Sequence, residues 1–196
     1  MHFEAPPRDG LEQRLDEFIQ WFNTSRTNTL LDPLIRAGIT HLVFLIPHPF
    51  DDCNGRITLT LTDLALAQMD QQSIRLYAMS PVILNKRKSY YEILEATQKG
   101  GSDITAWLLW FLQAFNDSLE QTLKRIERTL LKSTFWQIFS ELDLHEGQRK
   151  VLNRLLDGGE NGFEHGISAS QYKKVAKVSQ ATATRHLTDL LKKTDS

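Results

Sequence analysis

The spacing of apolar residues predicts helices along nearly the whole chain. Apolar side chains recur every three or four residues from Leu11 to Phe22 and from Ile104 to Leu130, which is the period of one face of an α-helix. Almost nothing alternates with the period of two that a half-buried strand shows. The predicted fold class is therefore mainly α, with helices over 11–23, 33–46, 54–68, 80–99, 104–130, 148–156, 168–175 and 179–193.

Capping residues support several of these helix ends. Asp32 followed by Pro33 has the form of an N-cap with proline in the first turn, and Asp103 can cap the long helix from Ile104. Gly100 and Gly101 end the preceding helix. The aromatic residues of the long helix are expected to pack in the core and not to form a ligand site.

A polar stretch over 140–146 predicts a boundary between a first domain, 1–140, and a small module, 146–196. The helices 168–175 and 179–193, separated by three residues, have the spacing of a helix-turn-helix. From Ser168 onward there are six basic against two acidic residues. The predicted DNA contacts are Lys173, Lys174, Lys177 and Arg185. No wing is expected after the last helix, and such a hairpin could instead serve packing only.

Composition narrows the function classes. With 196 residues, 41% hydrophobic and 24% charged, the chain is an ordinary globular protein, and its net charge of −1 argues against a wholly basic nucleic-acid binder. The single cysteine, Cys53, excludes an internal disulfide, and the histidines lack the spacing of zinc ligands. His41 is expected to be a packing residue. The sequence has neither a basic and apolar leader nor an apolar run of about 20 residues. We therefore expect a cytoplasmic protein without membrane contact.

One short stretch, 48–56, concentrates chemistry immediately before a predicted helix. His48 can act as a base and Asp52 can hold a hard cation such as magnesium. Asn54 and Gly55 can direct backbone N–H groups toward an anion, and Arg56 suits phosphate. A lone histidine is usually structural, but this combination at a helix N-terminus predicts an anion-binding site.

This stretch resembles the signature of Fic proteins, His-Pro-Phe-x-Asp/Glu-Gly-Asn-Gly-Arg-x-x-Arg. It departs from that signature at Cys53, where the pattern has its first glycine, and at Leu59, where it has its last arginine. The blocks 35–42, 61–68, 88–94 and 107–112 are also similar to those of Fic proteins that carry a C-terminal helix-turn-helix. The resemblance implies a Fic-type helical domain followed by a winged-helix-like module.

The resemblance further implies transfer of AMP from ATP to a hydroxyl on a target protein, with ATP and Mg²⁺ as the bound species. His48 would be the base, Asp52 the magnesium ligand, and Asn54, Gly55 and Arg56 the phosphate-binding residues. Leu59 cannot pair with the terminal phosphate, and Cys53 places a Cβ where the pattern has none, so activity is expected to be weak or lost. A reactive role for Cys53 is a further alternative, because a helix N-terminus and a nearby arginine favour a thiolate.

The first residues, 1–7, look like the last strand of the β-hairpin flap with which Fic proteins dock a target segment, and the rest of that flap is missing. The expected protein is thus a truncated Fic protein whose uncovered apolar faces favour a homo-oligomer or poor solubility. The rival interpretation is a non-catalytic regulatory module that binds DNA or oligomerises.

Overall fold

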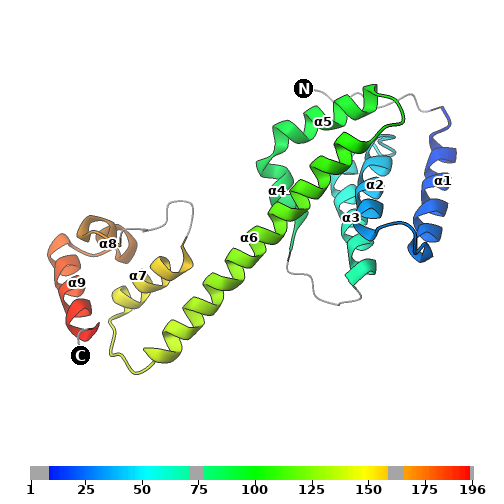
Figure 1. Cartoon of the computed structure of the whole chain (residues 1–196). Helices are drawn as coiled ribbons and strands as arrows, with labels where there is room; N and C mark the ends of the chain where they lie inside the picture. Colours follow the sequence, from blue (N-terminus) through cyan, green and yellow to red (C-terminus); the bar gives the residue numbers. More distant parts are fainter. Residues whose placement is uncertain (1–8, 71–76, 159–165, 195–196) are drawn as a thin grey trace. The chain divides into compact units, whose positions relative to one another are not determined.

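The computed structural model describes residues 9–70, 77–158 and 166–194, and every regular element in these ranges is a helix (Figure 1). The predicted fold class is confirmed. The proposed flap strand over 1–7 lies outside the described residues. The elements are α1 (Leu11–Thr24), the short 3₁₀ helix η1 (Ser25–Thr27), α2 (Pro33–Leu45), α3 (Asn54–Asp70), α4 (Met79–Asn85), α5 (Arg87–Lys99), α6 (Thr105–Ile138), α7 (Glu146–Asp157), α8 (Ala169–Ala176) and α9 (Gln180–Thr194).

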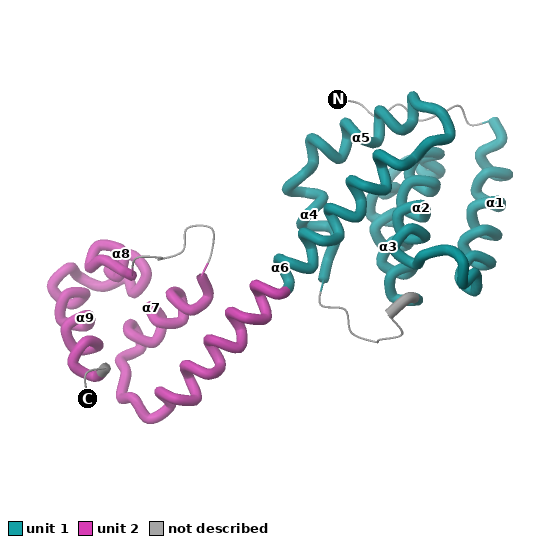
Figure 2. The backbone as a smooth tube through the Cα atoms, viewed as in Figure 1, with its two compact units in different colours: residues 1–122 teal, residues 123–196 magenta. Residues whose placement is uncertain are grey.

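The chain forms two compact units, Met1–Thr122 and Leu123–Ser196, which divide within α6 (Figure 2). The sequence placed the boundary over 140–146 instead. The second half of α6 belongs to the C-terminal unit because it bonds to α7: the Trp136 indole donates to Asn153 Oδ1 at 3.0 Å, and Lys132 pairs with Asp157 at 2.5 Å. The polar stretch 140–146 follows the end of α6, whereas the units divide earlier, after Thr122.

The core of the first unit forms where α2, α3, α5 and α6 meet. Trp107 and Phe111 on α6 are completely buried, which confirms that these aromatics pack in the core. The Trp107 indole donates to the Gly38 carbonyl at 2.9 Å. A Cβ on Gly38 would lie only 3.0 Å from the Leu108 and Phe111 side chains, so glycine allows α2 and α6 to approach this closely.

His41 is part of this core, as its predicted packing role requires. The ring is fully buried, with Nδ1 3.0 Å from Thr62 Oγ1 and Nε2 2.9 Å from Tyr90 Oη. Burial lowers the pKa of His41 to about 3. The imidazole is therefore neutral and ties α2 to both α3 and α5.

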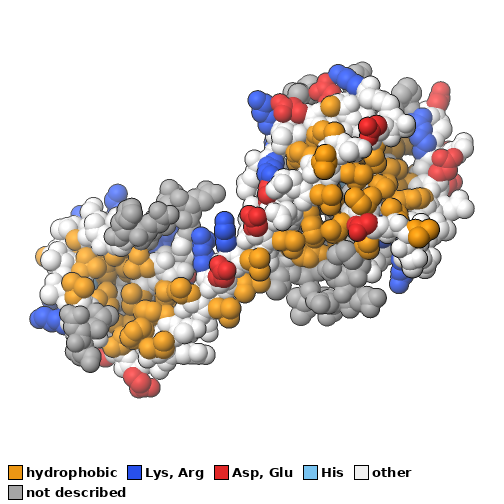
Figure 3. Space-filling model, in the orientation of Figure 1, with side chains coloured by type: hydrophobic (Ala, Val, Ile, Leu, Met, Phe, Trp, Pro, Cys, Tyr) orange, Lys and Arg blue, Asp and Glu red, His pale blue; other side chains and the backbone are white. Residues whose placement is uncertain are grey.

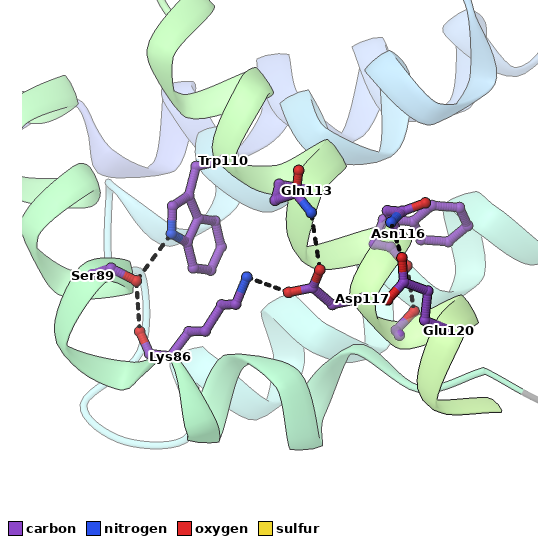
Figure 4. Close-up of polar contacts among 9 residues, drawn as sticks. Lys86, Ser89, Trp110, Gln113, Asn116, Asp117 and Glu120 are labelled. Carbon is purple, nitrogen blue, oxygen red and sulfur yellow. Dashed lines mark hydrogen bonds and ion pairs between the residues drawn. The ribbon is translucent and has the colours of Figure 1, made fainter. Parts of the chain in front are cut away.

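The predicted single helix over 80–99 is wrong, because the structure has α4 and α5 with a break at Lys86. Lys86 leaves the helical conformation (φ −99°, ψ 22°). Contacts with α6 hold the break: Lys86 pairs with Asp117, and Ser89 Oγ donates to the Lys86 carbonyl at 3.0 Å while accepting from the Trp110 indole at 3.2 Å (Figure 4). No glycine or proline marks this position, so the apolar pattern gave no signal of it.

One face of the first half of α6 is buried, whereas no residue of this helix after Thr122 is fully buried. The helix continues to Ile138, beyond the predicted end at Leu130. Leu123, Leu130 and Leu131 are each about 60% exposed, and hydrophobic side chains are visible on the surfaces of both units in Figure 3. None of the described helices combines the length and the apolar character needed to cross a membrane.

The C-terminal unit packs α7, α8 and α9 around Val151, Tyr172 and Ala183, all completely buried. Gln148 on α7 joins α9 through its amide, which donates to the His186 carbonyl at 3.0 Å and to Asp189 Oδ2 at 2.8 Å. The pair α8 and α9 thus rests on α7 as a small three-helix unit.

Candidate active site

The loop between α2 and α3 orients the predicted base. The His48 backbone has φ 50°, and both its N–H and its ring Nδ1 lie near the Leu45 carbonyl, at 3.2 and 3.3 Å. A carbonyl only accepts hydrogen bonds, so Nδ1 carries the proton. This tautomer leaves the basic lone pair of the imidazole on Nε2, which is the form that a general base needs.

Asn54 holds the loop in shape. Its side chain is 2% exposed, with Oδ1 accepting from the Phe50 N–H at 3.0 Å and Nδ2 donating to the Phe50 carbonyl at 2.5 Å. Both functional atoms of the amide are therefore bonded to the loop's own backbone. In this geometry, backbone N–H groups at the start of α3 would make the phosphate contact that the resemblance assigns to Asn54. The Asn54 amide would instead hold the loop beside them.

Cys53 adopts the left-handed backbone conformation, with φ 69°. A side chain in this region costs about 1–2 kcal/mol, so the glycine of the Fic pattern would fit this position without that strain. The Cys53 N–H donates to Asp52 Oδ1 at 2.6 Å, and this bond holds the pKa of the Asp52 carboxyl below its ordinary value. Asp52 is thus a carboxylate over the physiological pH range.

Arg56 reaches back toward the loop from the first turn of α3. Its Nη2 donates to Cys53 Sγ at 2.6 Å and lies 3.9 Å from Asp52 Oδ2. Both charged side chains are largely exposed, so this pair contributes little to stability. The Arg56 guanidinium can exchange these contacts for a phosphate at low cost.

Gly55 leaves the start of α3 open. A Cβ placed on Gly55 would meet no atom within 4 Å. The first N–H groups of an α-helix have no acceptor within the helix, and the helix dipole makes this end favourable for an anion. An anion can therefore approach the backbone closely at Gly55.

These features border one pocket of about 450 Å³. The structure brings together all five predicted site residues of this region, His48, Asp52, Asn54, Gly55 and Arg56, on its lining. The other side of the pocket comes from α5, and none of its residues is among the predicted site residues. The α5 residues on the lining are Arg87, Tyr90, Tyr91 and Leu94. The only sequence signal for this side was the similarity of the block 88–94.

The protein alone offers few metal ligands here. In the ranges that the structure describes, no cluster of three or more His, Cys, Asp or Glu side chains could hold a metal ion. Magnesium commonly takes one or two carboxylates and completes its coordination with substrate phosphates and water. The exposed Asp52 carboxylate on the pocket lining fits that kind of site.

The predicted DNA contacts lie in the other unit. Lys173 and Lys174 are on α8, Lys177 is in the turn before α9, and Arg185 is on α9, all of them exposed. Lys177 adopts the left-handed conformation that ends α8, with φ 54°. The turn between these helices has three residues, 177–179, and lies one residue later than the predicted turn.

The sequence around the loop between α2 and α3 is similar to that of known proteins. Residues 1–66 match the model of the Fic/DOC family. The chain is 32% identical over 90 residues to protein adenylyltransferase fic-1 of Caenorhabditis elegans, and 30% identical over 122 residues to protein adenylyltransferase Fic of Drosophila grimshawi. Over these residues the chain is similar to Fic proteins. The alignments cover 45% and 61% of this chain but only 16% and 22% of those relatives.

A solved structure has a similar helical fold. A Fic family protein from Desulfovibrio desulfuricans G20 superposes with a TM-score of 0.52 at 22% sequence identity. The match covers 92% of this chain and 47% of that protein. It therefore supports the helical fold, while this chain corresponds to about half of the longer protein.

Proposed function

We propose that the first unit binds ATP with Mg²⁺ and transfers AMP to a hydroxyl group of a protein, with lower activity than an intact Fic site. The observation that carries this proposal is the pocket itself. It combines a histidine base, a carboxylate, an arginine and an open helix N-terminus on one side with the aromatic surface of Tyr91 on the other. Such a lining suits a ligand with a planar base and a chain of phosphates.

In the proposed reaction, the target hydroxyl attacks the α-phosphorus of ATP. His48 Nε2 takes the hydroxyl proton as the P–O bond forms, and the bond from the α-phosphorus to the oxygen that bridges to the β-phosphate breaks to release pyrophosphate. The N–H groups around Gly55 and the Arg56 guanidinium stabilise the charge on the phosphate oxygens. Magnesium held by Asp52 would neutralise part of the phosphate charge.

Two features support reduced activity. Leu59 is half-buried against the hydrophobic core and does not line the pocket, so α3 supplies one cation, at Arg56, to this site. Cys53 lines the pocket and places a side chain where the Fic pattern has none. Both would weaken phosphate binding compared with the Fic pattern.

A glycine-to-alanine pair tests ATP binding in the pocket. Gly55→Ala adds a Cβ that meets no protein atom but projects into the space where the phosphates would lie. Alanine is favoured over glycine inside a helix by about 0.5–1 kcal/mol, so the variant should fold at least as well as the parent. We expect Gly55→Ala to weaken ATP binding strongly in isothermal titration calorimetry with Mg²⁺.

Gly101→Ala is the matched control, because a Cβ there also meets nothing and the residue lies outside the pocket lining. It should bind ATP like the parent. Equal ATP affinity in the parent and both variants would place ATP elsewhere, and no binding by the parent would reject the proposed function.

For the C-terminal unit we propose weak, sequence-independent DNA binding. The exposed cations on α8, α9 and the turn between them, together with the helix-turn-helix spacing, favour it. Each phosphate neutralised contributes about −0.9 to the slope of log K against log salt, so these few cations should give a slope of roughly −2 to −4.

The test is fluorescence anisotropy with a labelled duplex over a series of salt concentrations. Replacing Lys173, Lys174 and Arg185 with alanine should abolish binding. Lys150→Ala on α7 is a control that changes one exposed charge outside the two helices. Binding that survives the triple replacement, or that does not depend on salt, would show that α8 and α9 are a packing element.

A further inference from the structure

The loop before α3 does not by itself balance the charge of a nucleoside triphosphate. Two acidic residues of the loop, Asp51 and Asp52, line the pocket together with one basic residue, Arg56. Even with a divalent cation bound, a triphosphate remains an anion that binding sites neutralise with basic side chains. A second cation at this pocket would therefore contribute strongly to ATP binding.

Arg87 is the second arginine on the pocket lining, and it comes from the opposite side, at the first position of α5. Its neighbours in sequence are already paired, Lys86 with Asp117 and Lys88 with Glu92. Arg87 has no acidic partner among the residues that the structure describes; its guanidinium carbon lies 5.6 Å from the centre of the Tyr91 ring. This side chain can bind an anion without first breaking an ion pair with a described residue.

The backbone at Arg87 is held firmly in place. Figure 4 shows the residues that anchor it to α6: Lys86 contacts Asp117, and Ser89 bridges the Lys86 carbonyl and the Trp110 indole. The anchored residues lie on both sides of Arg87 in the chain. The same contacts that break the helix at Lys86 thus fix the point from which Arg87 extends, which lowers the entropic cost of binding a ligand there.

We propose that Arg87 is a phosphate-binding residue of this site, supplying from α5 the second cation that Leu59 does not supply from α3. The inference rests on the proposed function, because it takes ATP as the ligand of the pocket. Arginine is well suited to this task, since its planar guanidinium can donate two parallel hydrogen bonds to a phosphate.

The test compares Arg87→Ala with Lys88→Ala, a neighbouring charge removal outside the pocket lining, in calorimetric titrations with ATP, adenosine and inorganic tripolyphosphate. Loss of a charge-assisted hydrogen bond lowers affinity by roughly ten- to a hundred-fold. We expect this loss for ATP and tripolyphosphate in Arg87→Ala, with adenosine affinity unchanged. Lys88→Ala should match the parent with all three ligands.

A second arm asks whether a cation from α3 can take over. Leu59→Arg in the Arg87→Ala background should restore most of the lost ATP affinity. Equal losses for ATP and adenosine would mean that Arg87 acts through Tyr91 and would overturn the proposal. Unchanged ATP affinity in Arg87→Ala, with Gly55→Ala still weakening it, would overturn this proposal alone, whereas a parent chain that binds no ATP would overturn the proposed function as well.

Discussion

Replacing the two residues that depart from the Fic pattern with the residues of that pattern should strengthen ATP binding. Position 59 is three residues after Arg56 in α3, so an arginine there lies on the same face of the helix as Arg56 and Gly55. A charge-assisted hydrogen bond from this arginine to a phosphate contributes about 1.5–3 kcal/mol. The double variant Cys53→Gly, Leu59→Arg is therefore expected to bind ATP roughly ten- to a hundred-fold more tightly than the parent.

The effect on folding should be small, because two terms oppose each other. Glycine at position 53 removes about 1–2 kcal/mol of left-handed strain, of which about 0.5–1 kcal/mol is offset by the greater freedom of glycine in the unfolded chain. Replacing the half-buried Leu59 loses part of the 1.5–3 kcal/mol that full burial of a leucine contributes. Tighter ATP binding in the variant would thus not reflect a more stable fold.

Isothermal titration calorimetry with ATP and Mg²⁺ measures the change. The matched control is Cys53→Gly with Leu59→Gln, which removes the leucine and adds no charge. It should gain little affinity. An arginine variant that binds ATP no better than the parent would contradict the prediction, and so would a glutamine control that binds ATP as tightly as the arginine variant.

Three further predictions concern the core, the loop and association. Burial lowers the pKa of His41 from 6.5 to about 3, so the unfolded chain binds this proton at a higher pH than the folded chain does. The first unit should therefore lose about 2 kcal/mol of stability between pH 7 and pH 5. An NMR titration should find the His41 ring still neutral at pH 5, and protonation near pH 6.5 would contradict this. Asn54→Ala leaves the Phe50 N–H and carbonyl without their partner and should lower the free energy of unfolding by about 1–3 kcal/mol in thermal unfolding. An unchanged melting temperature would contradict the role of Asn54 in holding the loop. The exposed leucines of α6 should favour self-association, so light scattering should find an oligomer. The double variant Leu130→Glu, Leu131→Glu should lower the fraction of oligomer. A parent protein that stays monomeric at high concentration would contradict this prediction.

The helices were predictable from sequence, because a helix that buries one face has apolar residues at every third or fourth position. The break at Lys86 was not, since it depends on Asp117 and Trp110, which the fold brings from α6. The division within α6 was missed for a similar reason. An apolar stripe that continues past Thr122 does not reveal that its packing partner has changed.

The candidate site divides in the same way. Its first side is one short stretch of sequence, 48–56, so the chemistry was recognisable from residue types and order. Its second side is α5, and Arg87 reaches the pocket only because α5 packs beside the loop. The role of Asn54 is visible only in the structure, because an amide that bonds to its own loop and one that bonds to a ligand look identical in sequence.

The most direct measurement is transfer of label from ATP that carries it on the α-phosphate, with Mg²⁺, to this protein or to proteins of a lysate. We expect covalent label with the parent, more with the Cys53→Gly, Leu59→Arg variant, and none when His48→Ala is added to either. ATP labelled on the γ-phosphate should give no covalent label, because that phosphate leaves with pyrophosphate. Absence of α-label in the double variant once it binds ATP, or label that persists with His48→Ala, would contradict AMP transfer by this site.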